Sequence, residues 1–245
     1  MMAPTPLQPA LRQVRISDQV ASYIVQYIAE SRLAAGDVLP SENELARILG
    51  VSRPAVREAT NALAGRGIIA ITTGRAPTVL SLSEGPFSTL INHGLTTGQV
   101  STVQVLDVRR SLEEHGAMLA ARHRSAEDVL IVQGILLELG AAVGDVEAFS
   151  RVDMAFHRAL ARATGNVLLS CIMAGMADVA LESSRTGLRY AHGTSEWAEI
   201  LQVHRDIAAA VIMQDDALAR RHMNTHFDSA LRRLERGNDQ EETQT

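Results

Sequence analysis

At 245 residues the chain is long enough for two domains, and its 46 % hydrophobic but only 3 % aromatic composition favours aliphatic helical packing over sheets. Its apolar runs fall short of the roughly 18 residues that span a membrane, and its single cysteine, Cys171, excludes an internal disulfide, so we expect a cytoplasmic protein with no membrane segment. The net charge is −5, but it is divided unevenly: residues 1–82 hold eight Arg against six Asp and Glu, whereas the remainder holds 15 Arg against 22 Asp and Glu. Any nucleic acid is therefore expected to bind the N-terminal part.

The chain begins with MMAPTPLQPALRQ, which lacks the apolar core of a signal peptide. We expect residues 1–13 to be a disordered lead-in. Apolar residues then recur with helical spacing at Val20, Ile24, Tyr27 and Ile28, and Ser17 stands before them as a candidate N-cap. The pattern predicts a first helix at the start of a domain that covers residues 14–82.

Two short helical patterns follow almost without a gap in SENELARILGVSRPAVREATNAL. Ser41, with Glu44 three residues later, forms a capping box that starts the first of them. Gly50 ends that helix because it adopts the left-handed conformation at little cost. Ser52 caps the next helix, whose first turn tolerates Pro54 because no N–H is needed there. Two helices spaced so closely predict a helix-turn-helix.

The second helix of such a unit can lie in the DNA major groove with its N-terminal residues at the base edges. An arginine in that position reaches guanine with two hydrogen bonds or binds a phosphate. An ordinary helical hairpin with two solvated arginines is the simpler alternative. The residues at the start of this helix are Ser52, Arg53, Pro54, Ala55 and Arg57.

Two short strands are predicted downstream, over residues 68–72 and 78–82, and the turn TTGRAP between them is punctuated by Gly and Pro. Three helices followed by a hairpin make a winged helix. Gly74 and Arg75 stand at the tip of the wing, where they could approach the minor groove or its phosphates. For Arg75 alone, a hairpin with a solvated arginine is an equally good interpretation.

The segment LAAGDVLPSENELARILGVSRPAVREATNALAGRGII resembles the N-terminal domain of the GntR family of bacterial transcription regulators. The resemblance rests on the Gly-Asp before LPSE, the ELA and LGVSR runs and the VRE that follows. Two departures concern the operator sequence: Asn43 stands where members often carry arginine on DNA, and Pro54 with Ala55 replaces a common Thr-Pro. The predicted DNA-binding surface consists of Ser41, Asn43, Ser52, Arg53, Pro54, Ala55, Arg57, Gly74 and Arg75.

The remainder of the chain is predicted to be helical. Residues 83–100 contain Gly, Pro and Ser and are expected to form a linker, although Phe87, Leu90 and Ile91 could pack a short helix. Six helical patterns fill residues 101–236, which predicts a bundle. We expect this bundle to dimerise, and the resemblance implies that it also binds an effector. The acidic and polar residues 237–245 are expected to be a disordered tail. The predicted fold is therefore mainly α, with an N-terminal winged helix-turn-helix and a C-terminal all-helical bundle.

Three of the six helical patterns carry polar residues on their apolar faces. Asp153 and His157 lie four residues apart, and therefore on one face, within the apolar stripe of the third helix. His204 borders the stripe of the fifth helix and His226 lies within that of the sixth. One such histidine is usually a core residue with satisfied hydrogen bonds, but three of them with an aspartate are better explained together. A buried carboxylate is costly unless paired or bound to a metal, and imidazole with carboxylate suits zinc, nickel, manganese or iron.

The segments DMAFHRAL, VHRDI and MNTHF are similar to the FCD effector domain of FadR-like GntR regulators, and the resemblance covers about residues 101–235. It extends to VRRSLEEHGAMLAA and to the Gly-Asn at Gly165 and Asn166. It implies that Arg109 and Asn166 line an effector cavity, although a surface or capping role is an equally good interpretation for both. The matching residues imply a divalent metal held by Asp153, His157, His204 and His226.

Two classes of function fit these features. The first is a ligand-responsive transcription regulator, in this family most often a repressor, which binds a palindromic DNA operator as a homodimer and answers a small organic acid at a metal, with zinc favoured and nickel or manganese open. The second is a metal-dependent hydrolase, because an open position on a metal also activates water. The regulator is preferred because the histidine-bearing faces offer no further general base and a winged helix has no role in an enzyme. An architectural DNA-binding protein would not need the large acidic bundle.

Overall fold

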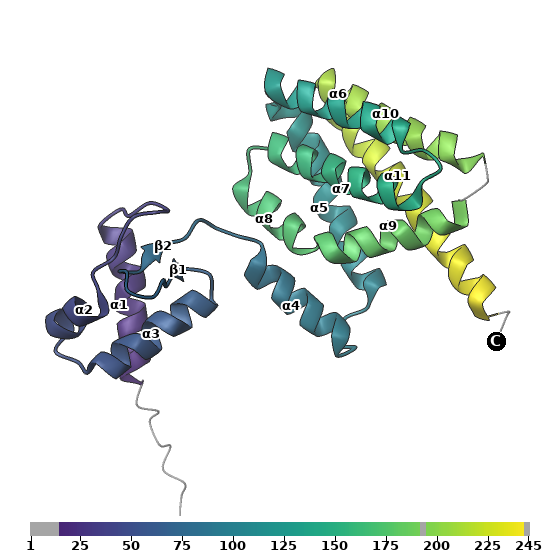
Figure 1. The fold of residues 1–245 in the computed structure, drawn as a ribbon. Helices are drawn as coiled ribbons and strands as arrows, with labels where there is room; N and C mark the ends of the chain where they lie inside the picture. The colour runs from purple at the N-terminus through teal and green to yellow at the C-terminus, as the bar shows by residue number, and fades with distance from the viewer. Residues whose placement is uncertain (1–14, 192–194, 243–245) are drawn as a thin grey trace, which may run out of the picture. The chain divides into compact units, whose positions relative to one another are not determined.

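The computed structural model describes residues 15–191 and 195–242. It divides the chain into two compact units, Met1–Ser83 and Glu84–Thr245, whose helices and strands are shown in Figure 1. The expected lead-in, residues 1–13, lies outside the described residues. The predicted fold class is confirmed: three helices and a hairpin make the first unit, and the described part of the second is helical.

The first helix of the N-terminal unit is α1 (Ile16–Glu30), which starts two residues earlier than an N-cap at Ser17 would require. Arg15 is the N-cap residue and makes no side-chain capping bond. Ser17 is instead buried, because it lies on the same face as Val20 and Ile24, three and seven residues further along. The expected cap at Ser17 is therefore wrong, whereas the predicted inward positions Val20 and Ile24 are confirmed.

The next two helices, α2 (Glu42–Leu49) and α3 (Arg53–Gly65), form the predicted helix-turn-helix. The capping box is present, with the Ser41 hydroxyl accepting from the backbone N–H of Glu44 and the Glu44 carboxylate accepting from the backbone N–H of Ser41. Gly50 ends α2 at a φ of 64°, in the left-handed region. Ser52 caps α3 through the N–H of Ala55. The core of this unit is formed by Val20, Ile24, Leu39, Leu45, Val56, Ala59, Leu63, Ile69 and Val79.

The wing is shorter than the sequence predicts. Its strands are β1 (Ile69–Ala70) and β2 (Thr78–Val79), paired antiparallel with Ile69 opposite Val79 and Ala70 opposite Thr78. An isolated bridge joins Val38 to Thr78. Only the residues next to the core are paired, because Ile69 and Val79 are the buried positions that hold the hairpin against α3.

The C-terminal unit contains more helices than the six predicted. The predicted fourth helix is divided at Met176, whose backbone leaves the helical region. No single described helix is long and apolar enough to cross a membrane, and only the pair on either side of Met176, bent by 57°, meets that test by length and composition. The helices are α4 (Gly85–Thr96), α5 (Thr102–His123), α6 (Ala126–Ala141), α7 (Val146–Ala163), α8 (Val167–Gly175), α9 (Ala177–Ala191), α10 (Glu196–Ile212) and α11 (Asp216–Glu242).

Helix α4 corrects the expected linker over residues 83–100. Ile91 and Leu95, which are four residues apart, pack with Val100 against Val105 and Met176, so an apolar stripe holds this segment on the bundle. The Gly and Pro that suggested a linker stand in the first turn of the helix, where Pro is tolerated.

We expect Gly175→Ala to destabilise the C-terminal unit by about 1–3 kcal/mol, as overpacking typically does. A Cβ at Gly175 would lie 2.6 Å from Cβ of Phe87 and 3.3 Å from the backbone nitrogen of Ser88, so α4 would have to move away from α8. Thermal unfolding followed by circular dichroism measures the loss. Gly134→Ala is the matched control, because nothing lies within 4 Å of that position. Equal melting temperatures for the two variants would contradict the packing of α4.

The expected disordered tail, residues 237–245, is also corrected. Helix α11 continues through residue 242, and residues 243–245 lie outside the described part of the chain. A single Gly at position 237 costs a helix only about 1 kcal/mol, and the Gln and Glu residues that follow it favour the helical state.

Candidate functional site

The four predicted metal-binding side chains meet in the interior of the C-terminal unit. Asp153 and His157 project from one face of α7, His204 comes from α10 and His226 from α11. All four are buried, and one potential ligand atom from each lies within 4.8 Å of the others. The ring centroid of His226 is 4.8 Å from that of His204 and 4.9 Å from that of His157. We call these four residues the His/Asp cluster.

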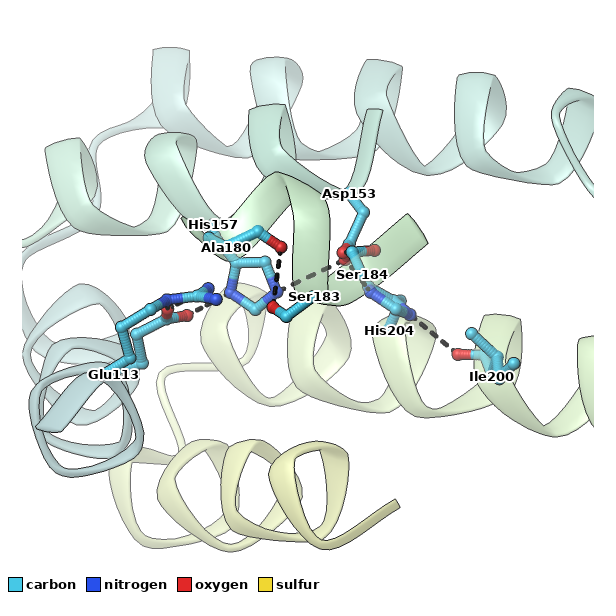
Figure 2. Close-up of polar contacts among 9 residues, drawn as sticks. Glu113, Asp153, His157, Ala180, Ser183, Ser184, Ile200 and His204 are labelled. Carbon is cyan, nitrogen blue, oxygen red and sulfur yellow. Dashed lines mark hydrogen bonds and ion pairs between the residues drawn. The ribbon is translucent and has the colours of Figure 1, made fainter. Parts of the chain in front are cut away.

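Hydrogen bonds orient His204 and Asp153 toward the centre of the His/Asp cluster. Nδ1 of His204 lies 2.7 Å from the carbonyl oxygen of Ile200, which can only accept, so Nδ1 carries the hydrogen and Nε2 faces Asp153 at 2.8 Å (Figure 2). Ser184 on α9 donates its hydroxyl to the other carboxylate oxygen of Asp153 at 2.9 Å. A histidine held through Nδ1 in this way presents Nε2 as a ligand, which is the usual arrangement around a metal.

His157 lies between two carboxylates. Its Nδ1 contacts Oε2 of Glu113, and its Nε2 is 3.3 Å from Oδ1 of Asp153, yet neither nitrogen has a partner with hydrogen-bond geometry (Figure 2). Burial by itself would lower the pKa of His157, but the two carboxylates raise it to about 9. Burial would likewise raise the pKa of Asp153, and its contacts with His157 and His204 hold that pKa well below the ordinary value. Without a metal, the cluster therefore carries a proton on His157.

Glu113 on α5 lies at the His/Asp cluster and was not singled out in the sequence. It is buried and accepts from Nε of Arg109 at 2.9 Å and from Nη2 at 2.5 Å. The buried face of α5 includes Arg109 and Glu113, whereas the neighbouring apolar residue Val108 is 52 % exposed. A potential ion pair four residues apart within the VRRSLEEHGAMLAA segment was the available signal.

The His/Asp cluster fits a divalent transition metal. Burial, followed by the nearby His204 and His157, holds the pKa of His226 well below its ordinary value, so this ring is neutral and has a lone pair to donate. Three imidazoles and one carboxylate are a donor set suited to zinc, nickel or manganese. The buried Nε2 of His157 has no hydrogen-bond partner, as expected of a nitrogen whose partner is a metal ion.

A small cavity of about 50 Å³ adjoins the His/Asp cluster, and a larger pocket of about 600 Å³ lies between α10 and α11. Both are lined by Ile200, His226 and Arg233. Arg109 lines the small cavity, as the resemblance implied. Asn166 does not line it: this residue is exposed, and its side chain caps α8 by accepting from the N–H of Leu169.

The predicted DNA-contacting residues lie at the surface of the N-terminal unit. Arg53 and Arg57 are exposed in the first turns of α3, and no described residue forms an ion pair or hydrogen bond with either guanidinium. The Ser41 hydroxyl is engaged in the capping box, whereas Asn43 is exposed on α2. The other positions are exposed except for Ala55, which is half-buried: Ser52 and Pro54 at the start of α3, and Gly74 and Arg75 in the turn of the wing.

Comparisons with known proteins match a described family to each of the two units. The family described as "Bacterial regulatory proteins, gntR family" matches residues 16–79, and the "FCD domain" matches residues 104–229, more than half of the chain. The chain is 35 % identical over 158 residues to the "HTH-type transcriptional regulator LutR" of Bacillus subtilis, which covers 64 % of this chain and 72 % of that protein. It is 29 % identical to the "Glc operon transcriptional activator" of Escherichia coli, over 89 % of each protein.

Among solved structures, the chain is similar to that titled "Streptococcus agalactiae GntR", with a TM-score of 0.68 and 25 % identity, over 88 % of this chain and 99 % of the other. The family matches and relatives are regulators of transcription, so the hydrolase alternative is not supported. The chain therefore belongs to the gntR family of bacterial regulatory proteins and is a ligand-responsive transcription regulator with an FCD domain.

Proposed function

We propose that this regulator is a repressor that binds a palindromic operator as a homodimer and releases or tightens it when a small organic acid binds at a metal centre in the helical bundle. The observation that carries the proposal is the buried His/Asp cluster beside a cavity, in a chain whose other unit is a helix-turn-helix. The repressor assignment follows the resemblance, in which most members repress. A relative printed as the "HTH-type transcriptional repressor NanR" is 27 % identical over 236 residues.

The metal would be held by Asp153, His157, His204 and His226, with zinc favoured over nickel and manganese. Such an ion supplies a Lewis acid with coordination positions left for a carboxylate oxygen. The residues of the chain orient this centre: Ile200 holds His204, Ser184 holds Asp153, and Glu113 contacts His157. An ion at this place would cross-link α7, α10 and α11.

On the DNA side, α3 is proposed to enter the major groove, with Arg53 and Arg57 reaching base edges or phosphates. A dimer is proposed because one unit with a net charge of +2 over residues 1–82 offers little attraction for DNA, and two copies double the phosphate contacts. An effector that binds one arrangement of the dimer better than the other shifts the population between DNA-competent and incompetent states.

Selection of bound duplexes from a randomised DNA pool tests this proposal. The enriched sequences are expected to contain two inverted half-sites about one helical turn apart, and light scattering is expected to give the mass of two chains on one duplex. Millimolar organic acids added to the zinc-loaded complex are then expected to change its affinity for the selected duplex. Enrichment of a single half-site, bound by one chain, would rule out the palindrome and the dimer together.

A further inference from the structure

Arg233 on α11 is a buried cation without a partner. Its side chain is 8 % exposed, and no described residue forms an ion pair or a hydrogen bond with it. Its Nε is buried with its hydrogen unused. Burying an unpaired charge costs several kcal/mol in typical proteins, so such a group is expected to have a counter-ion in the functional state.

The other arginine at the small cavity differs in this respect. Arg109 is bound by Glu113 through two nitrogens, so its charge is already compensated within the chain. Two carboxylates act on Arg233 electrostatically, those of Glu196 and Asp153. That of Glu196 is paired with Arg236 at 2.8 Å, and that of Asp153 is engaged by the histidines of the His/Asp cluster. Of the two guanidinium groups that line the small cavity, only that of Arg233 is available to an incoming anion.

Arg233 lies on the boundary between the small cavity and the large pocket. It lines both the small cavity at the His/Asp cluster and the large pocket between α10 and α11. The small cavity measures about 50 Å³ and the large pocket about 600 Å³, so a ligand whose carboxylate reaches the His/Asp cluster has most of its room in the larger pocket. The remainder of such a ligand would extend into the larger pocket, past Arg233.

We propose that Arg233, and not Arg109, is the residue that binds the effector carboxylate, and that the effector enters through the pocket between α10 and α11. This inference rests on the proposed function, since it assumes an anionic effector at the His/Asp cluster. A guanidinium binds both oxygens of a carboxylate in a planar, bidentate arrangement, so Arg233 would select small carboxylates, hydroxy acids among them, over neutral analogues.

The test uses full-length protein loaded with zinc and titrated with acetate, glycolate and malonate in a calorimeter. Arg233→Gln is expected to weaken the binding of these probes at least about tenfold, the usual loss for a charged hydrogen bond, while the zinc content by elemental analysis stays unchanged. Arg221→Gln, an exposed arginine elsewhere on α11, is the matched control and should bind the probes as the unmodified protein does. Arg109→Gln is expected to lower the melting temperature without any probe, because it removes the guanidinium charge and its hydrogen bonds from the buried carboxylate of Glu113.

Three results would overturn the inference. These are unchanged probe affinity in Arg233→Gln, a loss confined to Arg109→Gln, or no binding of any probe to the zinc-loaded protein. Absence of zinc from the unmodified protein would instead contradict the proposed metal centre, and the elemental analysis reports that outcome separately. Acetamide, the neutral analogue of acetate, should not bind in any variant.

Discussion

Replacing Arg57 by alanine is expected to weaken operator binding by about thirtyfold or more and to leave the helical content unchanged. A bidentate arginine contact contributes roughly 1–3 kcal/mol, and a dimer presents the residue twice. Arg57 is exposed one turn after Arg53 near the start of α3 and has no ion pair within the described part of the unit, so its removal costs the fold little. Fluorescence anisotropy on the selected duplex, at fixed salt, measures the loss.

The matched control for this experiment is Arg66→Ala, which removes an exposed arginine from the C-terminal end of the same helix. Arg53→Ala distinguishes the kinds of contact. A phosphate contact is lost uniformly across sequences and reduces the salt dependence, whereas a base contact relaxes specificity at one position. If Arg57→Ala binds as tightly as Arg66→Ala, α3 is not the helix that reads the operator.

Removing the metal is expected to lower the melting temperature of the C-terminal unit and to abolish the effector response, yet to spare operator binding. An ion that binds only the folded state adds roughly 3 kcal/mol of stability at a free concentration about a hundred times its dissociation constant. The proposed ligands come from three helices, so the loss should appear in the unfolding of the whole bundle. The DNA-contacting residues belong to a separate compact unit. Differential scanning calorimetry with and without a chelator provides the measurement.

Acid should weaken metal binding, and the sign follows from His157. In the metal-free protein its pKa is raised to about 9, so at neutral pH a divalent ion must displace a proton from this ring. Metal affinity is therefore expected to rise with pH up to about 9 and to fall below it. Calorimetry in buffers of different ionisation enthalpy counts the released proton.

His204→Ala and His157→Ala should reproduce the effect of the chelator, whereas His222→Ala should not. His222 lies one turn before His226 on α11 but outside the His/Asp cluster, which makes it the matched control. A protein that contains no metal by elemental analysis, is indifferent to the chelator and still answers its effector would identify these residues as core histidines.

Local sequence determined the helix-turn-helix and most of the His/Asp cluster. Capping boxes and left-handed glycines act within a few residues, so Ser41, Glu44 and Gly50 could be assigned without knowledge of any partner. The helical period alone places Asp153 and His157 together on one face. The other two histidines, His204 and His226, lie on the apolar faces of two further helices, and inward faces of one bundle meet in its interior.

Tertiary packing decided the features that depend on the rotation of a helix about its axis or on a distant partner. Residues 85–96 form a helix because Ile91 and Leu95 pack against Met176. The Gly and Pro content of this segment does not reveal that contact. Glu113 became part of the site because α5 packs with Arg109 and Glu113 on its buried face, where Glu113 meets His157. Whether an arginine is paired depends on side chains that meet only in the folded chain, so only the structure distinguishes Arg109, bound by Glu113, from Arg233, buried without a counter-ion.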